Sequence, residues 1–155
     1  MLLIARDVAA QQTGSAAIEV LLFMRKLLAS TWSPIIFDSK PARCATRAEE
    51  QRPFFEVFAA SKMYFNHFIK VHDFRVINRA FLWLLIARGA AVLFADGQCG
   101  VDVLLPFLYF DNKLRRDNVS AIFIQVKNDK RFSSTPRLLF DAMDPYFLGF
   151  FDMDE

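Results

Sequence analysis

Three consecutive runs of strand-forming residues constrain the fold of this chain more than any other feature of its sequence. They occupy residues 90–95 (AAVLFA), 101–110 (VDVLLPFLYF) and 120–128 (SAIFIQVKN), with short polar segments between them. Apolar runs rich in Val, Ile and Phe that are joined by short turns are typical of antiparallel hairpins. We therefore expect a small sheet, in which Pro106 lies at a bulge or on an edge strand because proline cannot donate to a ladder.

A helix is expected immediately before the first strand. Residues 73–89 begin with a capping residue, Asp73, and end at Gly89, and both residue types are preferred at helix ends. The apolar residues between them recur three and four positions apart, as in a helix that lies on a sheet. The recurring residues are Val76, Ile77, Ala80, Phe81, Leu84 and Leu85.

The N-terminal half is expected to be largely helical. Residues 15–29 carry good helix formers after a Ser N-cap, and residues 53–71 open with Pro53, which is favoured at the first helical position. Between them, residues 30–53 are polar and contain three prolines, so we expect a connecting loop there. A further helix is expected around residues 136–143.

These elements divide the chain into two expected regions. Residues 1–72 form an N-terminal helical region with a loop at 30–53, and residues 73–155 form an α/β core. The core is expected to be incomplete, because the chain ends where another strand would follow.

Composition excludes several classes of protein. A chain of 155 residues suffices for one domain with a core, and a net charge of +2 is too small to indicate nucleic-acid binding by itself. No segment approaches the roughly 18–20 uninterrupted apolar residues that span a bilayer, and the apolar run at the N-terminus is too short for a signal peptide. Cys44 and Cys99 lack the CxxC spacing of a zinc site. We expect an intracellular protein, nuclear or cytoplasmic, with no membrane partner.

Two of the strand-like runs carry polar residues that a buried strand does not need. Asp102 lies near the start of the second run. Gln125 and Lys127 lie near the end of the third, on one face because residues two apart in a strand point the same way. If these strands pair, carboxylate and amide oxygens that can hold Mg²⁺ meet at one end of the sheet. A lysine beside them can activate water or stabilise a phosphate transition state. The alternative is structural, with Asp102 a turn residue and Lys127 a solvated strand end.

The order of a helix, a strand, a strand with Asp and a strand with Gln-x-Lys resembles the PD-(D/E)XK nuclease superfamily. The resemblance covers residues 73–130. It implies an α/β, restriction-endonuclease-like core: a helix, then a small mixed sheet with a motif hairpin, preceded by further helices. It also implies a Mg²⁺- or Mn²⁺-dependent nuclease that acts on DNA. In that family's terms Asp102 binds the metal, Gln125 stands for the second acid as a metal ligand, and Lys127 is the catalytic lysine.

The stretch GVDVLLPF…AIFIQVKN also resembles domains of fungal mobile-element and Crinkler-type effector proteins. The sequence departs from the nuclease pattern in two ways. Members often carry a Glu on the helix before the first strand, and residues 73–89 contain none, which leaves Asp73 or Glu56 as substitutes. Gln125 is neutral, so Asp102 is the one certain carboxylate. The alternative function is therefore a catalytically inactive interaction module, an effector or mobile-element relic that keeps the fold.

Basic residues flank the two strands that carry the motif. The loop between these strands contains KLRRD at 113–117, and two more cations follow the third strand. Such residues could contact the phosphates of a nucleic acid, or form the solvated tip of a hairpin. They are Lys113, Arg115, Arg116, Lys130 and Arg131.

Overall fold

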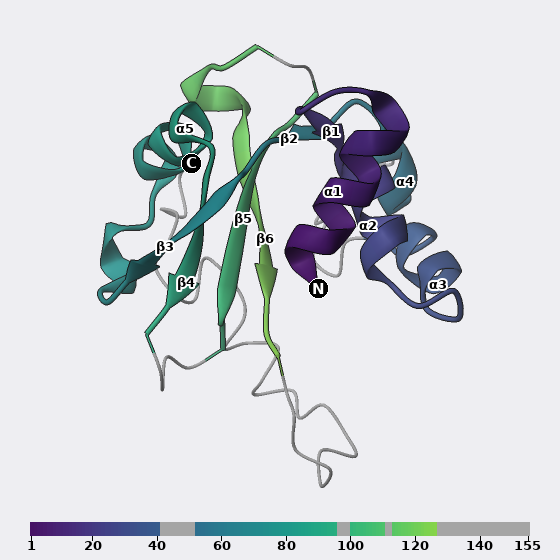
Figure 1. Cartoon of the computed structure of the whole chain (residues 1–155), viewed down its shortest axis with the longest axis horizontal. Coiled ribbons are helices and arrows are strands. Elements are labelled where there is room, and N and C mark those ends of the chain that lie inside the picture. Colours follow the sequence, from purple (N-terminus) through teal and green to yellow (C-terminus); the bar gives the residue numbers. More distant parts are fainter. Residues whose placement is uncertain (41–51, 96–99, 111–112, 127–155) are drawn as a thin grey trace, which may run out of the picture. The chain divides into compact units, whose positions relative to one another are not determined.

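The computed structural model describes residues 1–40, 52–95, 100–110 and 113–126 (Figure 1). The chain divides into two compact units, Met1–Tyr64 with Leu108–Lys113, and Phe65–Phe107 with Leu114–Glu155. Helices and strands occur in both, so the α/β class is confirmed. The division at residue 72 into an N-terminal region and a nuclease-like core stays a prediction. None of the helices in the described part of the chain combines the length and apolar character that a bilayer crossing requires.

The first unit is built on a pair of packed helices and a two-strand ladder. Helix α1 ends at Gly14, whose φ of 63° is the left-handed conformation that glycine adopts without strain. Ala5 and Ala9 of α1 are buried, and so is Phe23 of α2; α1 and α2 pack against each other. The elements are α1 (Leu2–Thr13), β1 (Ile18–Glu19), α2 (Val20–Leu27), α3 (Ser33–Phe37), α4 (Phe54–Val57) and β2 (Lys62–Met63).

The ladder explains why the helix expected over residues 15–29 starts late. Ile18 pairs with Met63 and Glu19 with Lys62, in antiparallel register. Both Ile18 and Met63 are buried, so pairing at this point removes more apolar surface from water than another helical turn would. Residues 20–27 are helical as expected, and α1 was not expected from the sequence.

The single helix expected over residues 53–71 is wrong. Helix α4 covers only Phe54–Val57, and the chain then forms β2 and β3 (His67–Val71). The aromatic residues of this segment follow no narrow stripe, which is the pattern of strands and turns whose side chains enter different parts of a core. The loop expected over 30–53 contains helix α3, while residues 41–51 lie outside the described part.

The second unit places helix α5 on a mixed sheet. Its elements after β3 are η2 (Phe74–Val76), α5 (Arg79–Arg88), β4 (Ala90–Phe94), β5 (Val103–Leu108), η3 (Arg116–Asn118) and β6 (Val119–Ile124). Strand β3 runs parallel to β4, whereas β4 and β5 are antiparallel, and β6 pairs with β5. The three strands expected from the sequence are confirmed within narrower bounds, and Figure 1 shows them side by side in teal and green. The third strand ends at Ile124, so Gln125 follows it instead of lying in it, and residues 127 and 128 lie outside the described part.

Strand β5 lies between β4 and β6, so of the two positions expected for Pro106 the edge strand is excluded, whereas the bulge stays a prediction. The register with β4 involves Val103 and Leu104. The missing N–H of Pro106 therefore falls beyond that paired segment, where it removes no hydrogen bond to β4. All six residues of β5 are buried, as expected for the inner strand of a sheet that a helix covers.

Helix α5 has the expected C-terminus at Gly89, with φ 64°, but starts six residues later than expected. The side chain of Asn78 caps it by accepting the N–H of Phe81 at 3.0 Å, while Asp73 caps the preceding 3₁₀ turn η2. The buried face of the helix also differs from the expected one. Leu82 and Leu85 are buried, and Leu84, which was expected on the apolar face, is 47 % exposed. The helix packs against β4, β6 and η3, as expected of a helix on a sheet.

Candidate functional site

Asp102 lies immediately before β5 and joins both neighbouring strands through its backbone. Its N–H donates to the carbonyl of Ile124 at 2.9 Å, and its carbonyl accepts the N–H of Phe94 at 3.0 Å. Its flanking residues, Val101 and Val103, are buried, whereas Asp102 itself is half-buried. The start of β5 thus lies beside the end of β6, which is the meeting point that the sequence indicated for the polar residues.

The Asp102 carboxylate also contacts the segment that follows β6. Its Oδ2 accepts the backbone N–H of Val126 at 2.6 Å. A hydrogen bond from a backbone N–H to an ionised carboxylate is shorter and stronger than one between neutral groups. The side chain therefore takes the place of a ladder partner just after β6 ends. This contact is compatible with both interpretations of Asp102, as a structural residue and as a metal ligand.

Gln125 is half-buried and directly precedes the residue that Asp102 binds. Lys127 directly follows that residue in the sequence and lies outside the described residues. The structure therefore brings Asp102 to the chain segment that carries Gln125, and it says nothing about the amine of Lys127. The donor types at this end of the sheet, one carboxylate and one amide, are those that a hard cation accepts. The described part of the chain contains no group of three or more His, Cys, Asp or Glu side chains that could hold a metal.

The two acids that could replace the missing helix Glu, Asp73 and Glu56, lie in different elements. Asp73 forms a two-point ion pair with Arg75, with Nε–Oδ1 and Nη2–Oδ2 distances of 2.9 Å, and also accepts the Arg75 backbone N–H. The side-chain hydrogen bond from Arg75 lowers the pKa of Asp73, with a further contribution from the backbone bond. Glu56 lies in α4, in the first unit. Asp73 is thus already engaged locally by a cation.

The basic residues expected to contact phosphates are described only in part, so their expected role stays a prediction. Lys113 is exposed and belongs to the first unit, while Arg115 belongs to the second and pairs with Asp117 at 3.6 Å. Arg116 opens the 3₁₀ turn η3. Lys130 and Arg131 lie outside the described residues.

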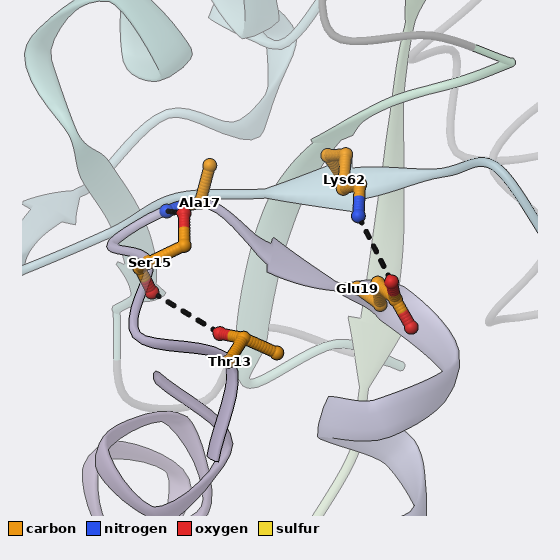
Figure 2. Close-up of a pocket in the computed structure, with 5 residues that line it drawn as sticks. All are labelled: Thr13, Ser15, Ala17, Glu19 and Lys62. Atoms are coloured by element: carbon orange, nitrogen blue, oxygen red, sulfur yellow. Dashed lines mark hydrogen bonds and ion pairs between the residues drawn. The ribbon is translucent and has the colours of Figure 1, made fainter. Parts of the chain in front are cut away.

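A polar hollow of about 500 Å³ lies in the first unit, beside the β1–β2 ladder (Figure 2). Lys62 donates to Glu19 at 3.1 Å across the ladder. The Ser15 hydroxyl accepts the N–H of Ala17 at 3.2 Å, and the Thr13 hydroxyl lies 3.3 Å from the carbonyl of Ala10, to which it donates. These groups complete a helix end and a turn, so their polarity is used within the chain.

A second hollow, of about 400 Å³, was not expected from the sequence. Aromatic rings of Phe54, Phe58 and Tyr109 line it together with the side chains of Lys40 and Arg52. Two signals could have revealed it: phenylalanines four apart at 54 and 58, which share a helical face, and the basic residues that precede them. Ser39 and Val57 also line this hollow, and we call the seven residues together the aromatic pocket.

No family model, no curated protein and no solved structure matches this chain.

Proposed function

We propose that the second unit is a metal-dependent nuclease-like module that hydrolyses nucleic-acid phosphodiesters. The observation that carries this proposal is the contact between Asp102 and the end of β6. It brings the acid of the motif to the chain segment of Gln-x-Lys, as the resemblance to the PD-(D/E)XK superfamily requires. The order of α5, β4, β5 and β6 also agrees with the order that the resemblance implies.

In this proposal each of the three residues has a distinct role. The carboxylate of Asp102 and the amide oxygen of Gln125 would hold Mg²⁺. The bound metal would supply positive charge for the phosphate oxygens of the substrate. Lys127 would take a proton from the attacking water or stabilise the negative charge that develops on the phosphate. Arg115 and Arg116 would bind phosphates of the nucleic acid.

A second function is favoured by a different property of the same contact. The backbone N–H of Val126 already donates a hydrogen bond to Oδ2 of Asp102, the only carboxylate in the motif, with an N–O distance of 2.6 Å. A single carboxylate is the fewest that protein sites for Mg²⁺ usually supply, and such a site relies on substrate phosphates for most of its charge. The second candidate is therefore an inactive interaction module that keeps Asp102 to hold the sheet together.

Plasmid nicking in the presence of Mg²⁺ or Mn²⁺ separates the two functions. The informative variants are Asp102→Asn and Lys127→Met. Asp102→Asn keeps an oxygen that accepts the Val126 N–H and removes the charge that a metal needs. Asp7→Asn is the matched control, because it makes the same chemical change at an exposed acid in the first unit.

For the nuclease, we expect nicking that requires the metal, that Asp7→Asn retains, and that falls at least 100-fold in each of the other variants. Circular dichroism would verify that every protein is folded. A folded wild-type protein that leaves the plasmid intact with both metals would overturn the nuclease proposal in favour of the interaction module. Equal nicking by all four proteins would have the same effect on the proposed site.

A further inference from the structure

The aromatic pocket of the first unit has walls made of ring faces and edges. The rings of Phe54 and Phe58 lie 4.4 Å apart between centroids with a tilt of 39°, and Phe58 meets Tyr109 edge-on at 5.4 Å. Phe37 packs edge-on against Phe54 from behind, at 6.0 Å. Phe37 is buried, whereas the three rings of the pocket are only half-buried. Part of each of these rings is therefore accessible to an aromatic guest.

Two cations, Lys40 and Arg52, line this pocket, and a backbone hydrogen bond connects their chain segments. The N–H of Phe54 donates to the carbonyl of Ser39 at 2.8 Å. Lys40 directly follows Ser39, and Arg52 lies two residues before Phe54. The hydrogen bond between Ser39 and Phe54 therefore brings the backbones of the two cations close together. Both are exposed and both line the pocket. Among the seven lining residues none is acidic; they are Ser39, Lys40, Arg52, Phe54, Val57, Phe58 and Tyr109.

An exposed aromatic residue in a strained conformation extends this surface. Phe110 has φ 70°, which is rare for a bulky residue with a side chain, and it is 57 % exposed. Its ring lies 3.8 Å from that of Tyr109 between centroids. Such backbone outliers cost free energy and often occur where a side chain serves a ligand. Here the strain is associated with a ring that faces solvent beside the pocket.

This combination fits one class of ligand. Ring faces stack on the flat bases of nucleotides, and cations at the rim attract phosphates; together they form the usual surface for single-stranded nucleic acid. The lining offers only the hydroxyls of Ser39 and Tyr109 as neutral side-chain hydrogen-bonding groups. A site for a free nucleotide normally adds several convergent polar groups that fix the base. A surface with rings, cations and few such groups binds bases of any kind within a strand.

We propose that the aromatic pocket binds one nucleotide of a single-stranded nucleic acid, with the base against Phe58 and Tyr109 and the flanking phosphates at Lys40 and Arg52. This site belongs to the first unit and requires neither a metal nor Asp102. Its success or failure is therefore measured independently of phosphodiester cleavage.

The test is the binding of fluorescein-labelled oligothymidylate, ten nucleotides long, to the full chain in EDTA, followed by fluorescence anisotropy. The charge variant is Lys40→Gln with Arg52→Gln. Its matched control, Lys26→Gln with Arg88→Gln, removes two other exposed cations. Because each phosphate contact to a single strand contributes about 0.7 to the slope of log K against log salt, we expect the charge variant to lower the slope by about 1.4. The control should keep the wild-type slope.

The ring variant is Tyr109→Leu, which keeps an apolar side chain and removes stacking. We expect about 10-fold weaker binding, because stacking on one aromatic ring contributes about 1–3 kcal/mol per base. The charge variant changes only exposed residues, so it tests the site even if Tyr109→Leu fails to fold. The proposal is overturned if the wild-type chain does not bind, or if the slope and affinity are equal in the charge variant and its control. Competition by free thymidine monophosphate as effective as that by the oligomer would also overturn it, in favour of a free-nucleotide site.

Discussion

The β5 segment of the second unit and the aromatic pocket of the first use similar residues in opposite ways. In β5 every residue is buried, and the polar residue at its start, Asp102, satisfies backbone groups of both neighbouring strands. In the pocket, the rings are half-buried and the two cations, Lys40 and Arg52, are exposed. The comparison teaches that a high aromatic and aliphatic content does not by itself indicate a core. What distinguishes the two regions is how far their side chains are exposed.

The largest expected effect comes from one substitution made in each region. Val92→Ala removes two methyl groups from β4, where Val92 is fully buried, and we expect the free energy of unfolding to fall by about 2–3 kcal/mol. Val57→Ala removes the same groups from the half-buried wall of the pocket. There we expect less than about 1 kcal/mol, because less apolar area is lost and alanine favours the helix. Urea denaturation measures both, and equal losses would remove the distinction between the regions.

The next effect tests whether Asp102 stabilises the sheet. Asp102→Ala leaves the Val126 N–H without its carboxylate partner, and hydrogen bonds to charged groups contribute about 1.5–3 kcal/mol. We expect a loss in that range for Ala and a smaller loss for Asn, which still offers an acceptor oxygen. Denaturation midpoints of the three proteins give the order. If Ala and Asn cost the same, the charge matters and the hydrogen-bond geometry does not.

A smaller effect separates the helices of the two units. Asn78 caps α5 through its side chain, and Asn78→Ala is expected to cost about 1 kcal/mol. Glu19 precedes α2 without a side-chain cap and pairs with Lys62 at the surface. Glu19→Ala should therefore cost between zero and about 1 kcal/mol, the range for exposed ion pairs. Thermal unfolding of both variants measures the difference, and a more damaging Glu19→Ala would show that the ion pair matters more than the cap.

The smallest effect is a dependence on pH. The side-chain hydrogen bond from Arg75 lowers the pKa of Asp73 below that of an unperturbed aspartate. A carboxyl whose pKa is lower in the folded state stabilises the fold above its unfolded pKa, and this stabilisation is lost as the pH falls through the folded pKa. The stability difference between the wild type and Asp73→Asn should therefore be constant near neutral pH and shrink below about pH 4. Urea midpoints measured from pH 7 to pH 2 test this, and a difference that grows in acid would contradict it.

Within the second unit, the sequence predicted the segment from α5 to β6 well because local signals there agree with the tertiary structure. Strand β3 of the same unit was wrongly expected to be part of the helix over 53–71. The strands at 90–95 and 101–110 have strong β-propensity and short connections, and the helix between Asn78 and Gly89 has both caps. The predicted proximity of Asp102 to the Gln125 segment followed from strand pairing alone. The position of Lys127 stays a prediction, since that residue lies outside the described part.

The first unit was predicted poorly because its structure depends on contacts between distant segments. Residues 53–71 have helix-forming composition, yet Lys62 pairs with Glu19, 43 residues earlier. Similarly, Tyr109 reaches Phe58 from a remote part of the sequence. Local periodicity carries no information about such partners, so the contribution of Tyr109 to the aromatic pocket could be found only from the structure.

The parallel ladder of β3 and β4 has a consequence for the order in which the chain folds. Its five pairs run from His67↔Ala90 to Val71↔Phe94, so every pair has the same sequence separation, 90 − 67 = 94 − 71 = 23. Most of the conformational entropy of loop closure is lost when the first pair forms. The remaining four pairs then form with little further loss of entropy. Formation of α5 shortens the loop before it closes. The segment from His67 to Phe94 thus contains its own nucleus, one that can assemble before the long-range ladder of β1 and β2.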